Sequence, residues 1–238
     1  MEIILNGAMG RMGRAFSAYC EKNGVPISGK CDISAERLSD FRKSGDVLVD
    51  FSDRSAAEET AAFIVSKKIP AVLATTGYGD REKSFIKKAA ESVPVFLSAN
   101  LSLGAAFLLF TAKRAAEFFP DADIEIVETH HSGKADSPSG TALLCFDFIK
   151  RARPEAFYSA EIKGPREKNS VGIHSLRLGG TCGEHEVIFA TSSQTVSVKH
   201  SVNNREAYCE GALAAARFIV GRKNGIYGIE DLFGGDFL

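Results

Sequence analysis

The sequence lacks several features that would place it in a special class. Its five cysteines are far apart, odd in number and without a C-x-x-C pair, so neither a disulfide framework nor a structural zinc site is indicated. No apolar run approaches the roughly 18 to 20 residues of a membrane span, and the N-terminus lacks the basic flank of a signal peptide. We therefore predict a cytoplasmic protein with reduced cysteines and no membrane partner.

An excess of charge is also missing. The formal net charge is -1, and Lys and Arg are scattered rather than gathered into one tract. Such a chain has no overall positive field to attract a polyanion, so we predict no nucleic-acid partner. With 45% hydrophobic and 25% charged residues the composition is that of a globular protein. Its 238 residues suffice for one large or two moderate domains.

The first hundred residues alternate between strand and helix patterns. Short apolar runs predict strands at 2–6, 25–31, 47–51, 71–75 and 93–97, and helical periodicity predicts helices at 11–23, 55–68 and 80–92. Between Asp32 and Val47 there is room only for a short helix at about 35–43. Strands that alternate with helices predict a parallel sheet with right-handed crossovers.

After Asn100 the pattern changes. We expect a long apolar helix at 102–118, a strand at 124–128, a polar loop and a helix from about Thr141. Strand-like stretches then fill 158–201, and an amphipathic helix at 204–220 is expected to pack back on the first domain.

A glycine-rich turn separates the first strand from the first helix. In Gly7-Ala8-Met9-Gly10-Arg11-Met12-Gly13, Gly10 and Gly13 fit the dinucleotide fingerprint G-x-G-x-x-G, while Ala8 replaces its first glycine. Glycines let the backbone approach a pyrophosphate, and the helix N-terminus offers it free N–H groups. The turn therefore predicts a dinucleotide site, and the alternative is an ordinary strand-to-helix turn.

An acidic residue strengthens this prediction. Asp32 lies nineteen residues beyond Gly13, at the end of the second predicted strand, where a carboxylate can accept hydrogen bonds from ribose hydroxyls. A carboxylate repels a 2′-phosphate and favours NADH, whereas the nearby Lys30, Arg11 and Arg37 permit NADPH. We predict NADH or NADPH as the cofactor.

These patterns together define the expected fold class and domains. We predict an α/β protein with a Rossmann-like dinucleotide-binding domain formed by residues 1–101 plus 206–238. Residues 102–205 are expected to form a second, α+β domain that carries a mixed sheet and serves substrate binding.

The segment at 128–142 concentrates residues that carry chemistry. His130, His131 and Lys134 can share acid–base work and anion binding near neutral pH. Ser139-Gly140-Thr141 opens a helix and presents N–H groups and hydroxyls to an anion, which suits a substrate carboxylate. The alternatives are a structural histidine at a strand end and an ordinary helix cap.

A metal site is the competing interpretation of this segment. His130 and His131 are adjacent on a segment expected to be extended, so their side chains would point to opposite sides. We also find no Cys or Glu at ligand spacing, and we therefore predict no metal.

The sequence resembles the dihydrodipicolinate reductase family over essentially its whole length. The segment His130-His131-Ser-Gly-Lys134-Ala-Asp-Ser-Pro-Ser139-Gly140-Thr141-Ala is similar to the family signature H-H-x-x-K-x-D-x-P-S-G-T-A. Other blocks agree in order: Gly7 to Arg14, Val49 to Ser52, Ala74 to Gly77, Ser98 to Gly104, Gly183 to His185 and His200 to Arg205. The chain departs from the family in its short segment after Asp32, in Leu101, where an aromatic is common, and in Ile33, where some members have a basic residue.

The resemblance implies reduction of 4-hydroxy-tetrahydrodipicolinate, a dicarboxylate, to tetrahydrodipicolinate in diaminopimelate and lysine biosynthesis. Water is lost, hydride comes from the nicotinamide, and protonation completes the product. It implies His130 as proton donor and acceptor, Lys134 as proton donor, and a homotetramer formed through the second domain's sheet. The substrate-binding residues implied are His131, Ser139, Gly140 and Thr141. The cofactor-binding residues implied are Gly7, Ala8, Met9, Gly10, Arg11, Met12, Asp32, Ala74, Thr75, Thr76, Ser98, Ala99, Asn100 and Leu101.

Two other functions stay open from the residues alone. One is a reductase of the same fold that acts on a different small acid. The other is a nucleotide-binding redox sensor without catalysis, which would have no need for His130 and Lys134. Arg177, His200 and Arg205 either approach the substrate or stabilise the second domain.

Overall fold

The computed structural model describes residues 1–159 and 164–232 and separates the chain into two compact units. The first unit combines Met1–Leu103 with the segment that starts at Arg205, and the second unit is Gly104–Asn204. The parts of the predicted domains at 160–163 and 233–238 lie outside the described residues.

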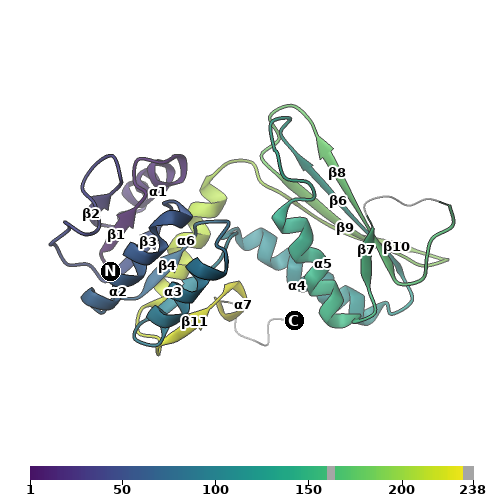
Figure 1. Cartoon of the computed structure of the whole chain (residues 1–238). Helices are drawn as coiled ribbons and strands as arrows, with labels where there is room; N and C mark the ends of the chain where they lie inside the picture. The colour runs from purple at the N-terminus through teal and green to yellow at the C-terminus, as the bar shows by residue number, and fades with distance from the viewer. Residues whose placement is uncertain (160–163, 233–238) are drawn as a thin grey trace. The chain divides into compact units, whose positions relative to one another are not determined.

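The first unit contains a six-stranded parallel sheet, which confirms the predicted α/β class (Figure 1). The order of its strands is β11-β5-β4-β3-β1-β2. Their bounds are Ile3–Asn6 (β1), Ile27–Cys31 (β2), Val47–Asp50 (β3), Ala71–Leu73 (β4), Pro94–Leu97 (β5) and Gly225–Tyr227 (β11). The helices of this unit are Arg11–Lys22 (α1), Ala57–Lys67 (α2), Asp80–Ala90 (α3), Glu206–Ile219 (α6) and Ile229–Leu232 (α7), with a 3₁₀ turn at Arg54–Ala56.

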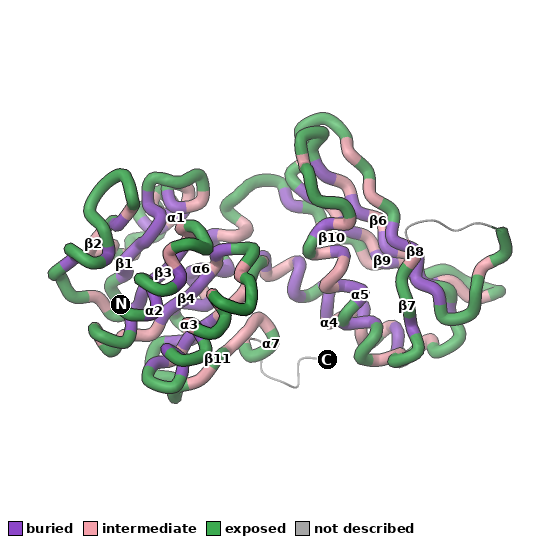
Figure 2. Tube along the Cα trace, viewed as in Figure 1, coloured by how far each residue is buried: buried purple, intermediate pink, exposed green. Residues whose placement is uncertain are grey.

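Both faces of the centre of this sheet are buried, because the central strands β1, β3 and β4 are largely apolar on both sides, as is usual in parallel sheets (Figure 2). Ile3 and Leu5 of β1 pack with Phe16 of α1 and with the small residues of α6. Ile4, the residue between them, points to the opposite face. There it belongs to a second core cluster with Ile64 of α2 and buried residues of α3. The last long helix therefore packs on the first unit, as predicted.

Two parts of this unit differ from the predictions. The predicted helix at 35–43 is wrong, because the chain there forms turns. Only Leu38 and Phe41 of this stretch bury their side chains, and they are three residues apart, so one turn is enough to place both. The second difference is β11, a three-residue edge strand that pairs with β5 and was not predicted.

The second unit contains a mixed five-stranded sheet, as predicted. Its order is β10-β9-β6-β8-β7; β6 is parallel to β8 and antiparallel to β9. The strand bounds are Asp123–His130 (β6), Phe157–Ser159 (β7), Ser170–Arg177 (β8), Glu184–Ala190 (β9) and Thr195–Ser201 (β10). Two helices, Leu103–Phe118 (α4) and Gly140–Ala152 (α5), share an apolar core with one face of the sheet.

Strand β6 is longer than expected and ends at His130 rather than at Glu128. Its alternate residues Ile124 and Ile126 are buried in the core with α4 and α5. Since side chains alternate along a strand, Glu128 and His130 continue this same face. The helix-covered face of β6 thus changes from apolar to ionisable at the end of the strand.

No helix in the described part of the chain has the length and apolar character needed to cross a membrane. All five cysteines are free thiols; Cys182 is exposed and the other four are buried.

Candidate active site

The glycine turn after β1 needs glycine at two positions. Gly7 has a φ of +72°, and a Cβ on it would lie 2.5 Å from the backbone carbon of Phe51. A Cβ on Gly13 would lie 2.1 Å from the carbonyl oxygen of Gly7, so helix α1 starts directly against the turn. Gly10 caps this helix without a side-chain hydrogen bond. The first-turn N–H groups are therefore available to an anion.

Asp32 follows β2 and faces this turn. Its Oδ2 accepts a hydrogen bond from the backbone nitrogen of Met9 at 3.0 Å, and its Oδ1 accepts from the backbone nitrogen and hydroxyl of Ser34. Burial opposes its ionisation, but these hydrogen bonds outweigh burial and hold the pKa of Asp32 below its ordinary value. The carboxylate is charged at neutral pH.

A cavity of about 350 Å³ opens beside the turn. It joins Gly7, Gly10 and Asp32, three of the predicted cofactor residues, with Arg37. The rest of its lining is Asn6, Ile33, Leu38, Phe51, Ser52, Asp53, Ser55, Ala56 and Glu59. Sequence reasoning did not single out Phe51, Ser52 and Asp53 as site residues, although they follow β3 at the carboxyl edge of the sheet, where ligands bind in such folds.

The remaining predicted cofactor residues do not line this cavity. Ala74, Thr75 and Thr76 follow β4, and the hydroxyl of Thr75 donates to Asp50 at 3.3 Å. Leu101 is buried in the core of the first unit, in the same cluster as Leu213 of α6. Ser98 and Asn100 form a tight turn after β5. These residues nevertheless share the carboxyl edge of the sheet with the glycine turn.

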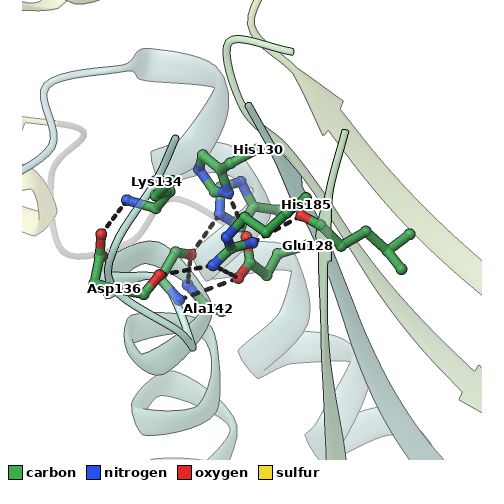
Figure 3. Close-up of polar contacts among 9 residues, drawn as sticks. Glu128, His130, Lys134, Asp136, Ala142 and His185 are labelled. Carbon is green, nitrogen blue, oxygen red and sulfur yellow. Dashed lines mark hydrogen bonds and ion pairs between the residues drawn. The ribbon is translucent and has the colours of Figure 1, made fainter. Parts of the chain in front are cut away.

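The second candidate region lies in the other unit, at the polar end of β6. The strand register places His130 opposite Arg177 of β8, and Glu128 opposite His185 of β9. Figure 3 shows Glu128, His130 and His185 together near the first turn of α5, with Lys134 and Asp136 beside them. Three strands and the loop before α5 therefore contribute to one cluster.

Glu128 is at the centre of this cluster and has no exposed surface. Its Oε1 accepts hydrogen bonds from Nη2 of Arg177 at 2.9 Å and from the backbone nitrogen of Ser139 at 3.3 Å. Its Oε2 is hydrogen-bonded to Nδ1 of His130. Both carboxylate oxygens are therefore satisfied, as burial of a charge requires.

Burial and charge shift the pKa values of the cluster. Burial opposes the ionisation of Glu128, but the hydrogen bonds from Arg177 and its other donors prevail and lower its pKa. For His130, burial outweighs the neighbouring carboxylate and lowers the pKa. Burial, with His130 nearby, lowers the pKa of His185 to about 4. At neutral pH the cluster holds a carboxylate, a guanidinium and two neutral imidazoles.

The predicted catalytic residue Lys134 and the predicted substrate-binding residues lie in the loop after β6 and in the first turn of α5. Nζ of Lys134 lies 2.7 Å from Oδ1 of Asp136 in an ion pair. The hydroxyl of Ser139 accepts from the backbone nitrogen of Ala142 at 3.2 Å, so it caps α5, and it also lies 3.0 Å from Nε2 of His185. His131 is exposed, and so is Gly140 at the first position of α5, where a Cβ would have no neighbour within 4 Å.

One premise about metals is wrong. Glu128 does stand near His130, and ligand atoms of Glu128, His130 and His185 lie within 4.8 Å of one another. The oxygens of Glu128 are, however, already hydrogen-bonded to Arg177 and His130. The positive charge of the Arg177 guanidinium would also repel a metal ion. We interpret the trio as a hydrogen-bonded network around His130.

The three uncertain residues of the second domain fall in different places. Arg177 joins the network through Glu128 and also donates to the carbonyl oxygen of Asp136 at 2.7 Å. His200 lies against Gly104, where a Cβ would come within 2.5 Å of its ring. Arg205 is the residue before α6. Glu128 and His185 were missed as site residues, yet the alternation of Ile124, Ile126, Glu128 and His130 was a signal for Glu128.

Comparison with known proteins agrees over the whole chain. Residues 1–101 match the family model described as "Dihydrodipicolinate reductase, N-terminus", and residues 104–233 match "Dihydrodipicolinate reductase, C-terminus". A 4-hydroxy-tetrahydrodipicolinate reductase of Caldanaerobacter subterraneus is 37% identical and covers 98% of both chains. One from Clostridium tetani is also 37% identical, over 97% of this chain and 96% of its own.

Solved structures give the same fold. A dipicolinate-bound dihydrodipicolinate reductase from a Paenisporosarcina species superposes with a TM-score of 0.79 at 24% identity, over 97% of this chain and 98% of that one. A probable dehydrogenase from Thermotoga maritima gives 0.62 at 11% identity, over 98% and 92%. With both family models matched and full-length relatives at 37% identity, the chain belongs to the dihydrodipicolinate reductase family.

Proposed function

We propose that this chain reduces 4-hydroxy-tetrahydrodipicolinate to tetrahydrodipicolinate with NADH or NADPH, in diaminopimelate and lysine biosynthesis. The observation that carries this proposal is the His130–Lys134 loop at the end of β6, which bears the family signature and adjoins a buried acid–base network. Its full-length relatives are named 4-hydroxy-tetrahydrodipicolinate reductases, and the family uses NAD(P)H as cosubstrate.

The first unit would hold the dinucleotide. The two obligatory glycines let the backbone approach a pyrophosphate, and the uncapped start of α1 offers it N–H groups. Asp32 would accept from the ribose hydroxyls and favour NADH, while Arg37 in the same cavity would accommodate a 2′-phosphate. The segments 74–76 and 98–101 would complete the site toward the nicotinamide, which supplies the hydride when bound.

The second unit would bind the dicarboxylate. Dipicolinate, the ligand bound in the Paenisporosarcina structure, has two carboxylates like the proposed substrate. We assign one of them to the start of α5, with Ser139, Gly140, Thr141 and His131, where the helix dipole favours an anion. Lys134 would supply positive charge once a substrate carboxylate competes with Asp136 for its ammonium.

The chemistry of the residues suits the proton steps. Water leaves the substrate, hydride addition makes an electron-rich ring, and one proton must then be delivered to it. Lys134 has an ammonium that can donate this proton, and His130, neutral because its pKa is lowered, can accept and pass on protons. We also assign the sheet of the second unit to the contacts of a homotetramer.

A coupled assay tests the function. The substrate is made in place from aspartate semialdehyde and pyruvate by a purified synthase, and oxidation of NADH and NADPH is followed by absorbance. We expect turnover by the wild type with both cofactors, and its collapse in Lys134→Ala with cofactor binding retained. Cofactor binding without turnover in the wild type would reject this substrate and favour a reductase for another acid or a sensor.

A further inference from the structure

The two oxygens of Glu128 have separate tasks. Oε1 accepts from Arg177 and Ser139, whereas Oε2 is bonded to Nδ1 of His130. We propose that Glu128 is a positioning residue: it fixes the ring of His130 with the proton on Nδ1, so that Nε2 exchanges protons with the substrate. This inference rests on the proposed function, in which His130 moves a proton.

The protonation of Nδ1 follows from the charge of Glu128. An ionised carboxylate can only accept hydrogen bonds, so the ring nitrogen that faces it must carry the proton. Arg177 supplies a fixed positive charge 2.9 Å from the other carboxylate oxygen, and this charge keeps Glu128 ionised even without solvent contact. In neutral His130 the proton on Nδ1 leaves the lone pair on Nε2.

Nε2 is free for this task. It has no hydrogen-bond partner among residues 1–159 and 164–232, and 11% of the His130 side chain stays exposed. Gly183, the residue directly before β9, lies beside it: a Cβ there would come within 3.2 Å of Nε2. A residue without a side chain thus leaves this nitrogen uncovered.

Charged and titratable groups face His130 from each element around it. They are Glu128 on its own strand, Arg177 on β8, His185 on β9, and Lys134 with Asp136 in the loop before α5. Glu128 favours the imidazolium, whereas burial, Lys134 and Arg177 oppose it. If the carboxylate is removed, the strongest remaining contributions come from burial, Lys134 and Arg177. All three lower the pKa of His130.

The variant Glu128→Gln tests whether the carboxylate keeps the proton on Nδ1 of His130. Arg177 and Ser139 both donate toward Oε1, so the amide oxygen of the glutamine will face them and its NH₂ group will face Nδ1 of His130. A donor at that place forces Nδ1 to become the acceptor and moves the proton to Nε2. The lone pair that the reaction needs is then on the wrong nitrogen.

We expect kcat of Glu128→Gln to fall by about 10² or more, with binding of NADH unchanged. The acid limb of its kcat/KM profile should shift to lower pH, because the imidazolium loses its carboxylate partner. In ¹⁵N NMR of histidine-labelled protein, His130 should carry its proton on Nδ1 in the wild type and on Nε2 in the variant; His130→Gln assigns the signals.

Glu125→Gln is the matched control. Glu125 is on the same strand but on the opposite face, where it pairs with Arg166 and with Nε2 of His174 at 2.7 Å. This variant also loses a carboxylate between a histidine and an arginine, but on the face of β6 opposite to His130. We expect its kcat to stay within about twofold of the wild type and its pH profile to be unchanged.

Several outcomes would overturn the proposal. One is a His130 of the wild type with Nδ1 unprotonated, which needs no variant and so does not depend on whether Glu128→Gln folds. Another is a slow Glu128→Gln enzyme with the wild-type pH profile and the proton still on Nδ1, since that would indicate a merely structural role. Failure of the proposed function would be distinguishable from this. The wild type would then not turn over the proposed substrate, while NMR would still show the proton of His130 on Nδ1.

Discussion

The two faces of β6 carry the same three kinds of side chain in different surroundings. On the face covered by α5, Glu128 joins His130 and Arg177 and has no exposed surface. On the opposite face, Glu125 joins His174 and Arg166, and 26% of its side chain is exposed. The sets are chemically alike, yet only the first has the His130–Lys134 loop beside it. Function therefore follows from burial and position rather than from composition.

The alternation of β6 explains this difference. Ile124 and Ile126 bury their side chains in the core with α4 and α5, and Glu128 and His130 follow on the same face. A buried carboxylate must be fully hydrogen-bonded, so its partners are held in one arrangement. Glu125 instead lies across Gly172 of β8, where a Cβ would come within 1.8 Å of its oxygen, and solvent screens its charge.

Replacement of one histidine on each face should give the largest difference, which is a difference in kcat. His130→Gln removes the group to which we assign proton transfer, and it should lower kcat by about 10² to 10⁴. His174→Gln should leave kcat within about twofold. Steady-state assays with cofactor binding measured in parallel will decide. Equal losses in both variants would break the comparison.

The second contrast concerns acid stability. The pKa of His185 is lowered from 6.5 to about 4. Above pH 6.5 it is neutral in both states, and as the pH falls toward 4 the unfolded chain takes up a proton that the folded one resists. This should cost about 3 kcal/mol of the free energy of unfolding. Urea titrations between pH 7 and pH 4 should show that the free energy of unfolding falls less steeply with pH in His185→Gln than in the wild type; identical slopes in the two proteins would contradict the prediction.

A smaller effect is expected at the loop beside His130. Gly183→Ala would place a methyl group 3.2 Å from Nε2 in a backbone with a φ of +153°, so kcat/KM should fall by about tenfold. Gly180→Ala is the control, since a Cβ there has no neighbour within 4 Å. If the two alanine variants have the same kcat/KM, Nε2 of His130 does not face the substrate.

The smallest expected quantity is the coupling energy on the outer face. A double-mutant cycle of Glu125→Gln and His174→Gln, followed by urea unfolding, should give about 0.2–1 kcal/mol because the pair is partly solvated. The same cycle for Glu128 and His130 should give more. A larger value for the outer pair would reverse the ranking of the two faces.

Much of the fold was predictable because long patterns carried it. The strand–helix alternation predicted the parallel sheet, and the change of pattern after Asn100 predicted the mixed sheet. The predicted helix at 35–43 failed because two apolar residues three apart fit a single turn as well as a helix. Strand β11 was missed because three residues, Gly225–Tyr227, are too few to show alternation.

The candidate site was only partly predictable. The loop with His130 and Lys134 and the glycine turn are local in sequence, so their motifs were visible. Arg177 meets Glu128 across 49 residues, and this contact depends on the register of β6 with β8, which no local pattern contains. Glu128 was overlooked because the adjacent pair of His130 and His131 is a more conspicuous pattern than the two-residue spacing from Glu128 to His130.

The edge strand β11 also bears on the order in which the chain folds. Among the described residues the second unit is one continuous run, Gly104–Asn204, so its described strands have all been synthesised before α6 begins. The first unit needs α6 for one of its cores and β11 beside β5, and both come from the last part of the chain. On the ribosome the second unit can therefore close first, while the earlier-made β5 waits with an open edge.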